Sequence, residues 1–256
     1  MKLQGGIIIQ TSQPSQTAQA VAMGVLFLSQ DPLLGKLVAP DAVAPTRWFI
    51  QAFPGWFAEF YKLFDLPLVR TLYQSIEKMT FPGISIHNAL RKCWLEEQTI
   101  SIIADNCKQV IALGAGFDTL AYRLHHLFPE VRWWEVDHPA TQQVKERALS
   151  EHGDVKPNLS FAPLDFTQQT LQNLLENLAD FNAGETTLFI AEGLLMYLRE
   201  TEVIDLLHAI HTYSGSKSIL LGSVLKPAAD GRLAIPGTSP LVDVRLQIMG
   251  EPYRWG

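Results

Sequence analysis

The chain has 256 residues, of which 47% are hydrophobic, and a formal net charge of −6. This length and composition predict one folded unit with a sizeable core. Because nucleic-acid-binding proteins neutralise several phosphates with clustered Lys and Arg, and no such cluster occurs here, no nucleic-acid partner is expected. The two cysteines, Cys93 and Cys107, are too few for a disulfide framework and lack metal-ligand spacing, so neither disulfides nor a metal site are expected.

The N-terminal region contains two apolar runs that are too short for export or membrane insertion. Ile7 to Ile9 is shorter than the apolar part of a signal peptide. Ala20 to Leu28 has about half of the ~20 residues that a membrane-spanning helix needs. We therefore expect a cytoplasmic protein with no membrane partner.

Residues 1–82 are predicted to form a helical N-terminal segment, or cap. Small and apolar residues from Thr17 to Leu28 favour a helix, which Asp31-Pro32 should end. Aromatic residues at spacings of three and four then predict helices that bury them between cap and core, or else form a wall of a substrate pocket. These aromatic residues are Trp48, Phe49, Phe53, Trp56, Phe57, Phe60, Tyr61 and Phe64.

Residues 83–225 alternate between helical and strand patterns. A helix predicted over 90–104 precedes the first of five short apolar strands, and further helices separate the strands. Such alternation indicates right-handed crossovers and an α/β fold with a doubly wound, mostly parallel sheet. The predicted strands are 109–113, 131–136, 159–163, 187–191 and 218–224, and the intervening helices are 119–127, 140–150, 167–179 and 201–212.

Residues that directly follow the strands are the candidates for a binding site, because ligands of such folds lie outside the carboxyl ends of the strands. Gly114 and Gly116 follow the first strand and would let the backbone approach a ligand closely. Asp137 follows the second strand, 23 positions after Gly114, where a carboxylate can accept from both ribose hydroxyls. The pattern therefore predicts a nucleoside-containing cofactor.

Two features disfavour a nicotinamide dinucleotide and a NAD-dependent oxidoreductase. The third glycine of the dinucleotide fingerprint would fall at Thr119. Asp118 also places an anion at the helix N-terminus that would have to bind the pyrophosphate. S-adenosylmethionine (SAM) has no phosphate and carries two positive groups, so Asp118 can contact it, although Asp118 can equally cap the following helix.

Three segments resemble the leucine carboxyl methyltransferase family and occur in the family's order. The resemblance implies a class I SAM-dependent methyltransferase and points to its bacterial O-methyltransferases of polyketide and other secondary metabolism, which act on small molecules. The segments are VIALGAGFDTLAYRL at 110–124, EVDHPATQ at 135–142 and AEGLLMYL at 191–198.

The resemblance also assigns individual residues. Asp137 would hold the ribose hydroxyls, Glu192 the methionine ammonium and Arg91 the methionine carboxylate, while Tyr197 would lie near the transferred methyl group as the catalytic residue. The remaining cofactor-binding residues that it implies are Gly114, Ala115 and Gly116 under the methionine and ribose, Asp118 and His138 beside them, Asp165 and Phe166 at the adenine, and Gly193 next to Glu192.

Two departures from the family pattern lead to further expectations. The helix that begins near Thr17 lacks the basic residue that would help to hold the SAM carboxylate. Residues 226–256 resemble a cap insertion or a truncated C-terminal part, and the closing pair of strands is expected to be missing. An exposed sheet edge should then lower the stability or pair with a second copy. A truncated or non-catalytic SAM-binding homologue is accordingly an alternative.

The sequence leaves the methyl acceptor open. A carboxylate is already ionised at neutral pH and needs no general base, whereas a phenol or alcohol would profit from one. No dedicated base stands out among the histidines. We therefore expect O-methylation of a carboxylate or hydroxyl of a small metabolite.

Overall fold

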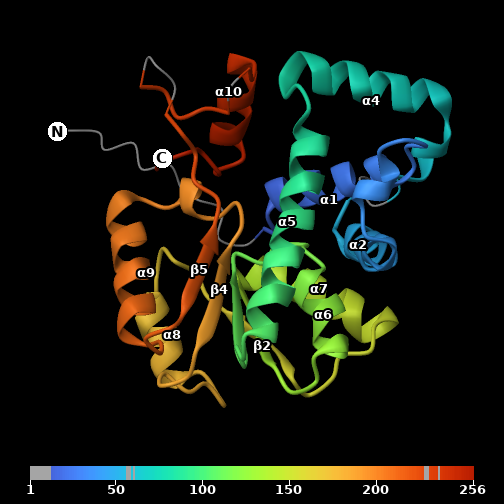
Figure 1. The fold of residues 1–256 in the computed structure, drawn as a ribbon. Helices are drawn as coiled ribbons and strands as arrows, with labels where there is room; N and C mark the ends of the chain where they lie inside the picture. Colours follow the sequence, from blue (N-terminus) through green and yellow to red (C-terminus); the bar gives the residue numbers. More distant parts are fainter. Residues whose placement is uncertain (1–12, 56–58, 60, 228–230, 236) are drawn as a thin grey trace.

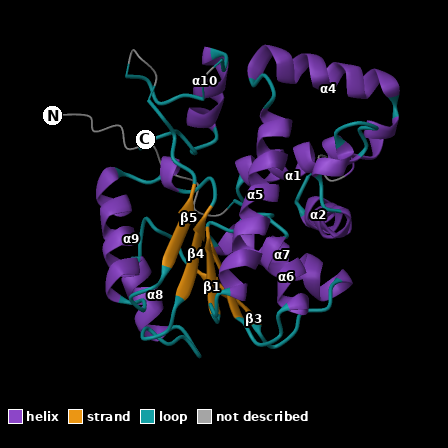
Figure 2. Ribbon diagram, in the orientation of Figure 1, coloured by secondary structure: helices purple, strands orange, loops and turns teal. Residues whose placement is uncertain are grey.

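Five parallel strands form the centre of the molecule (Figures 1 and 2). The computed structural model describes residues 13–55, 59, 61–227, 231–235 and 237–256, so Ile7 to Ile9 and the predicted aromatic residues Trp56, Phe57 and Phe60 lie outside the described residues. The sheet order is β3-β2-β1-β4-β5. The strands are β1 (Gln109–Leu113), β2 (Arg132–Asp137), β3 (Leu159–Pro163), β4 (Thr187–Ala191) and β5 (Ile219–Gly222).

Helices cover both faces of this sheet, which confirms the predicted doubly wound α/β fold. Side chains that alternate along each strand enter two separate hydrophobic clusters. Val110 packs with the helices of one face, whereas Ile111 packs with those of the other. The helices that contribute to the first cluster include α5 (Ile84–Ala104), α6 (Leu120–Leu127) and α7 (Pro139–His152), and those of the second are α8 (Leu171–Asn177) and α9 (Glu200–Thr212).

The predicted helix over 167–179 is wrong at both ends. Asp165 accepts from the backbone N–H of Thr167 and from the side chain of Gln168, which makes a turn in place of a first helical turn. Thr170 then caps α8 by accepting from the N–H of Asn173. The helix is therefore only seven residues long.

The N-terminal helices pack beside the sheet, and the C-terminal helix lies beyond the end of β5 (Figure 1). α1 confirms the helix predicted near Thr17, and α2 overlaps the helices predicted among the aromatic residues, although its start was not predicted. The bounds of α4 and α10 were not predicted, and both, like α2, begin with a proline at the first position. No helix in the described part of the chain is long and apolar enough to span a bilayer. The N-terminal helices are α1 (Gln16–Ser29), α2 (Pro40–Ala52) and α4 (Pro67–Thr80), and the C-terminal helix is α10 (Pro240–Ile248).

Candidate functional site

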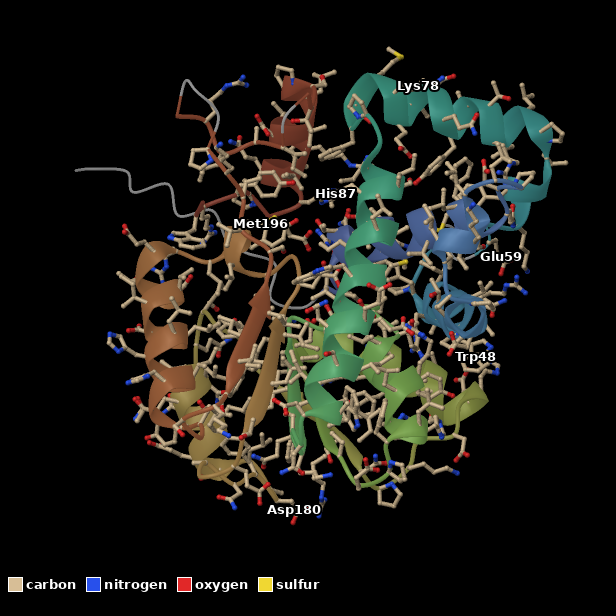
Figure 3. The ribbon with its side chains drawn as sticks, in the orientation of Figure 1. Trp48, Glu59, Lys78, His87, Asp180 and Met196 are labelled. Carbon is tan, nitrogen blue, oxygen red and sulfur yellow. The ribbon has the colours of Figure 1, made fainter. Side chains whose placement is uncertain are left out.

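The sheet order places the predicted site at one edge of the molecule. β1 lies between β2 and β4, so the chain moves outward from β1 to β3 and then returns to the other side of β1. The carboxyl ends of these parallel strands share an edge, and ligands of open α/β sheets bind where the order reverses. Met196, labelled in Figure 3, lies toward this end of the molecule, and Asp180 lies at the opposite end.

The turn after β1 is closely packed and needs glycine. Gly114 and Gly116 have φ values of +65° and +49°, in the left-handed region. A Cβ at Gly114 would lie 3.0 Å from a side-chain carbon of Leu194, and a Cβ at Gly116 would lie 3.2 Å from the Cβ of Ala18. A side chain at Gly114 or Gly116 would therefore press on Leu194 or Ala18.

Asp137, at the end of β2, bonds to this turn. One of its carboxylate oxygens accepts from the backbone N–H of Gly116, and the other accepts from that of His138 at 2.6 Å. Burial raises the pKa of Asp137, although both backbone donors oppose this effect. Each oxygen keeps a further lone pair, so the carboxylate can still accept from two hydroxyl groups.

Asp165, after β3, lies near His138, the residue that follows Asp137. The Nε2 of His138 is 3.8 Å from an oxygen of Asp165, while its Nδ1 accepts from the N–H of Ala140 at the start of α7. His138 therefore has the structural role of a helix cap and also faces the predicted adenine position. Phe166 packs at the margin of the second hydrophobic cluster.

Four charged side chains, which we call the charged cluster, meet between α5, the glycine turn and the end of β4: Arg91, Lys92, Asp118 and Glu192. Arg91 Nε donates to Glu192 Oε1 at 2.8 Å. Lys92 Nζ lies 3.3 Å from Glu192 Oε2 and also contacts the carboxylate of Asp118. The cluster thus brings together three predicted cofactor contacts, Arg91, Asp118 and Glu192, with one residue that was not predicted, Lys92.

The ionisation of the charged cluster follows from these contacts. Burial alone would raise the pKa of Asp118, but the ammonium of Lys92 holds it well below its usual range. Burial alone would lower the pKa of Lys92, but the carboxylates of Asp118 and Glu192 raise it. Asp118 also accepts from the N–H of Leu120, the first residue of α6, at 2.7 Å. The N-cap of α6 is Thr119, however, and not Asp118 as the capping alternative predicted.

Tyr197 lies after β4, where the C-terminal residues cross the same edge. Its ring centroid is 5.6 Å from that of Tyr253. The N–H of Arg254 donates to the carbonyl oxygen of Met196 at 2.7 Å, and Glu251 accepts from the N–H of Thr17 at 3.0 Å. The segment 250–256 therefore connects the start of α1 to the residues around Tyr197.

Gly193 follows Glu192 at φ +64°, and its N–H donates to the hydroxyl of Ser223 at 2.7 Å. This bond fixes the end of β4 to the segment after β5. The same loop lies near α5, since a Cβ at Gly193 would be 3.8 Å from NH2 of Arg91.

The aromatic residues predicted between 48 and 64 pack mainly within the core where they are described. Phe49 and Phe53 lie with their ring centroids 6.1 and 5.9 Å from Phe117, in the glycine turn. Trp48 packs against Tyr122. This arrangement agrees with the interpretation that they bury an interface between the N-terminal helices and the α/β core.

Sequence reasoning missed Lys92, Thr17 as a partner of Glu251, and Glu251 itself. Lys92 directly follows Arg91 and could have been suggested as the cation absent from the first helix. Glu251 could not, because 234 positions separate it from Thr17.

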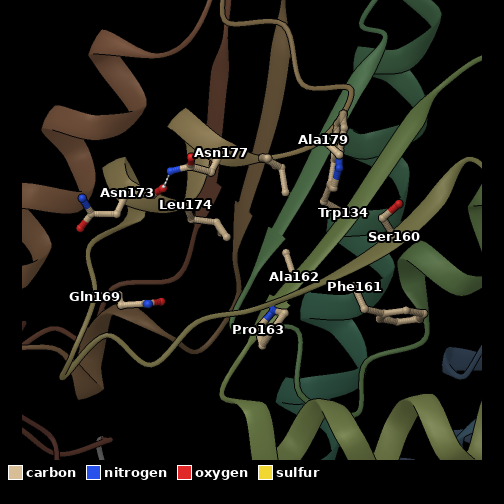
Figure 4. Close-up of a pocket in the computed structure, with 11 residues that line it drawn as sticks. Trp134, Ser160, Phe161, Ala162, Pro163, Gln169, Asn173, Leu174, Asn177 and Ala179 are labelled. Atoms are coloured by element: carbon tan, nitrogen blue, oxygen red, sulfur yellow. Dashed lines mark hydrogen bonds between the residues drawn. The ribbon is translucent and has the colours of Figure 1, made fainter.

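A cavity of about 500 Å³ lies away from these residues, between β3 and α8 (Figure 4). Trp134 and Ala162 line it, together with the side chains of Gln169 and Asn173. None of the predicted site residues lines this cavity.

Comparisons with known proteins identify similar sequences. Residues 20–211 match the family model described as Leucine carboxyl methyltransferase. A protein of Mycobacterium sp. (strain MCS) is 31% identical over 133 residues, which are 50% of this chain and 53% of that protein. A protein of Mycobacteroides abscessus is 28% identical over 257 residues, which are 95% of this chain and 79% of that protein. Both are provisionally named S-adenosyl-L-methionine-dependent methyltransferases. This chain matches about half the length of several such curated relatives.

Solved structures share the fold. A protein of Streptomyces avermitilis has a TM-score of 0.56 at 12% identity, with 97% of this chain and 80% of that chain covered. A protein of Thermobifida fusca, provisionally named a methyltransferase, has a TM-score of 0.53 at 15% identity, with 99% and 80% covered. At this identity the likeness concerns the architecture alone.

Proposed function

Because the chain belongs to the leucine carboxyl methyltransferase family, we propose that it is a SAM-dependent methyltransferase. We propose further that it transfers the methyl group to a carboxylate or hydroxyl oxygen of a small molecule in the cytoplasm, in secondary metabolism. The names of the relatives support the cofactor, since they describe those proteins as SAM-dependent.

The observation that carries the proposal is the contact between Asp137 and the glycine turn. A carboxylate held by backbone N–H groups and next to two glycines without Cβ atoms fits a ribose that lies on the turn. Asp118 and Glu192 are anions suited to an ammonium, and the guanidinium of Arg91 suits a carboxylate. The residues present therefore fit the proposed cofactor.

Bound SAM would supply an electrophilic methyl group on a positively charged sulfur. The chain itself would hold an acceptor oxygen in line with that methyl group and keep water out. Burial raises the pKa of Tyr197, with Tyr253 and Glu251 adding to the effect, so its phenol keeps its proton at neutral pH. Tyr197 would therefore orient an acceptor by donating a hydrogen bond, and would not act as the base.

Isothermal titration calorimetry with SAM tests the cofactor site. Asp137→Ala removes the acceptor for the ribose hydroxyls, and loss of hydrogen bonds to a charged group should weaken binding about tenfold or more. Glu151→Ala, an exposed change at the far end of α7, is the matched control and should bind as the unaltered chain does. An unchanged affinity in a folded Asp137→Ala chain would contradict the site assignment.

Turnover then tests the acceptor class. Incubation with SAM and panels of small carboxylic acids and phenols, followed by mass spectrometry, should detect a methylated oxygen. Binding of SAM without methylation of any panel member would favour the alternative of a non-catalytic homologue.

A further inference from the structure

Lys92 contacts both carboxylates of the charged cluster, Asp118 and Glu192. Its Nζ contacts Asp118 and lies 3.3 Å from Oε2 of Glu192. The other oxygen of Glu192 lies 2.7 Å from NH2 of Arg91 and accepts from its Nε. Both oxygens of Glu192 thus already have cationic partners, one of which is a primary ammonium.

The charged cluster is also closed and electrically balanced. The side chains of Glu192 and Lys92 are only 11% and 24% exposed, which leaves little room for an additional cation. Two cations face two carboxylates, so the cluster offers an entering cation no net negative charge. A ligand ammonium can gain Glu192 only if a resident cation gives up its contact.

Of the two cations, Lys92 is the one that a ligand ammonium resembles. The primary ammonium of Lys92 has three N–H donors, as a ligand's primary ammonium does, whereas the planar guanidinium of Arg91 contacts Glu192 through two nitrogens. Lys92 can also keep its partner Asp118 when it leaves Glu192. We propose, resting on the proposed function, that Lys92 is a tethered competitor for the cofactor's ammonium and so limits the affinity of the site for SAM.

Calorimetry on the unaltered 256-residue chain and three variants tests this role. The variants are Lys92→Met, which removes the charge but keeps a long side chain, Lys92→Arg, which keeps a cation, and Lys217→Met, an exposed lysine before β5. Each chain is titrated with SAM and with 5′-methylthioadenosine, which has the nucleoside and the sulfur but no ammonium. Lys92→Met should bind SAM about tenfold more tightly, as one charge-assisted contact implies, and 5′-methylthioadenosine equally well.

The controls and a ligand-free measurement complete the test. Lys217→Met should bind both ligands as the unaltered chain does, and Lys92→Arg, which keeps a cation beside Glu192, should bind SAM no more tightly than the unaltered chain. Without ligand, Lys92→Met should have a lower Tm, because Asp118 and Glu192 lose a buried partner. If Lys92→Met does not fold, Lys92→Gln, which can still donate to one carboxylate, replaces it.

The outcomes separate two failures. Unchanged or weaker SAM binding by Lys92→Met, with 5′-methylthioadenosine still bound, would overturn the role of Lys92 and leave the proposed function intact. Failure of all four folded chains to bind either ligand would contradict the proposed function and, with it, the competitor role.

Discussion

The ammonium of Lys145 lies 2.5 Å from a carboxylate oxygen of Glu135, and both side chains are 2% exposed. Lys145 also donates to the carbonyl oxygen of Asp118 at 2.6 Å, and its Nζ lies 5.3 Å from the ring centroid of Phe49. The pair thus ties α7 and β2 to the glycine turn and to α2.

Removal of one partner of this pair should be costly. Lys145→Met leaves Glu135, whose pKa burial already raises to about 7 against the opposing charge of Lys145, without its cation. We expect the free energy of unfolding to fall by about 3–5 kcal/mol. Urea denaturation measures it, and the double variant Lys145→Met/Glu135→Leu should lose less than Lys145→Met alone. A larger loss in the double variant would mean that the pair is not the source of the effect.

Gly116→Ala should affect both stability and the cofactor site. At φ +49° an alanine is strained by about 1–2 kcal/mol, and its Cβ would press on Ala18 at the start of α1. Gly83→Ala is the control, since Gly83 has φ +76° but nothing within 4 Å of a Cβ. Both variants should lose stability in thermal unfolding, and only Gly116→Ala should weaken SAM binding. Equal SAM affinities would show that the glycine turn does not contact the cofactor.

His125 should make the stability depend on pH. It is completely buried, its Nδ1 lies 2.6 Å from the carbonyl oxygen of Tyr122, and its Nε2 accepts from the N–H of Lys156. These contacts fit a neutral ring with the proton on Nδ1. Burial lowers the pKa of His125, with His126 adding to the effect. The unfolded chain therefore takes up this proton at a higher pH than the folded one, so the contribution of His125 is complete above pH 6.5 and decreases as the pH falls below it.

Urea denaturation between pH 8 and pH 5, as round values that bracket the usual histidine pKa of about 6.5, checks this expectation. The loss of stability on acidification should be smaller in His125→Gln than in the unaltered chain. His211→Gln, at the exposed end of α9, should retain the full loss. Parallel curves for all three chains would contradict the role of His125.

Arg123 should hold the N-terminal helices to the α/β core. Its side chain, 7% exposed, extends from α6 to Glu96 of α5, with a bond of 3.0 Å from NH1, and to Asp41 of α2 at 3.1 Å. Glu96→Gln keeps the shape but removes the charge, and should cost about 1–2 kcal/mol. Asp41→Asn, at a carboxylate that is 60% exposed, should cost less than half of that. Urea denaturation measures both losses of stability. Equal losses would contradict the larger role assigned to the bond between Arg123 and Glu96.

The strand pattern of this protein could be predicted because buried parallel strands are short, apolar and bounded by turn residues. Residues 109–113, 159–163 and 187–191 were predicted with the bounds that the structure has. The bounds of α4 were not predicted, although its apolar residues recur at helical spacing on one face. In the structure this face is largely exposed, with Leu68 at 80% and Met79 at 78%.

The part of the candidate site that lies at the carboxyl ends of the strands could be predicted from the order of the strands along the chain. Asp137, Asp165 and Glu192 follow consecutive strands, so the sheet topology alone brings them to one edge. The partners that neutralise or position them depend on how helices pack on that edge. Lys92 reaches Glu192 because α5 lies beside the loop after β4, and no sequence spacing reports that packing.

The residue at the end of β3 affects how folded copies associate. β3 and β5 are the outer strands of the described sheet, and β3 ends with Pro163. Proline has no N–H, so the outer side of β3 offers one hydrogen-bond donor fewer to a strand of another copy. Pro163 therefore disfavours pairing of another strand with β3. β5, Ile219–Gly222, contains no proline, and Ile219 is 38% exposed. Aggregation in concentrated solution, or the predicted pairing of two copies, should therefore begin along β5.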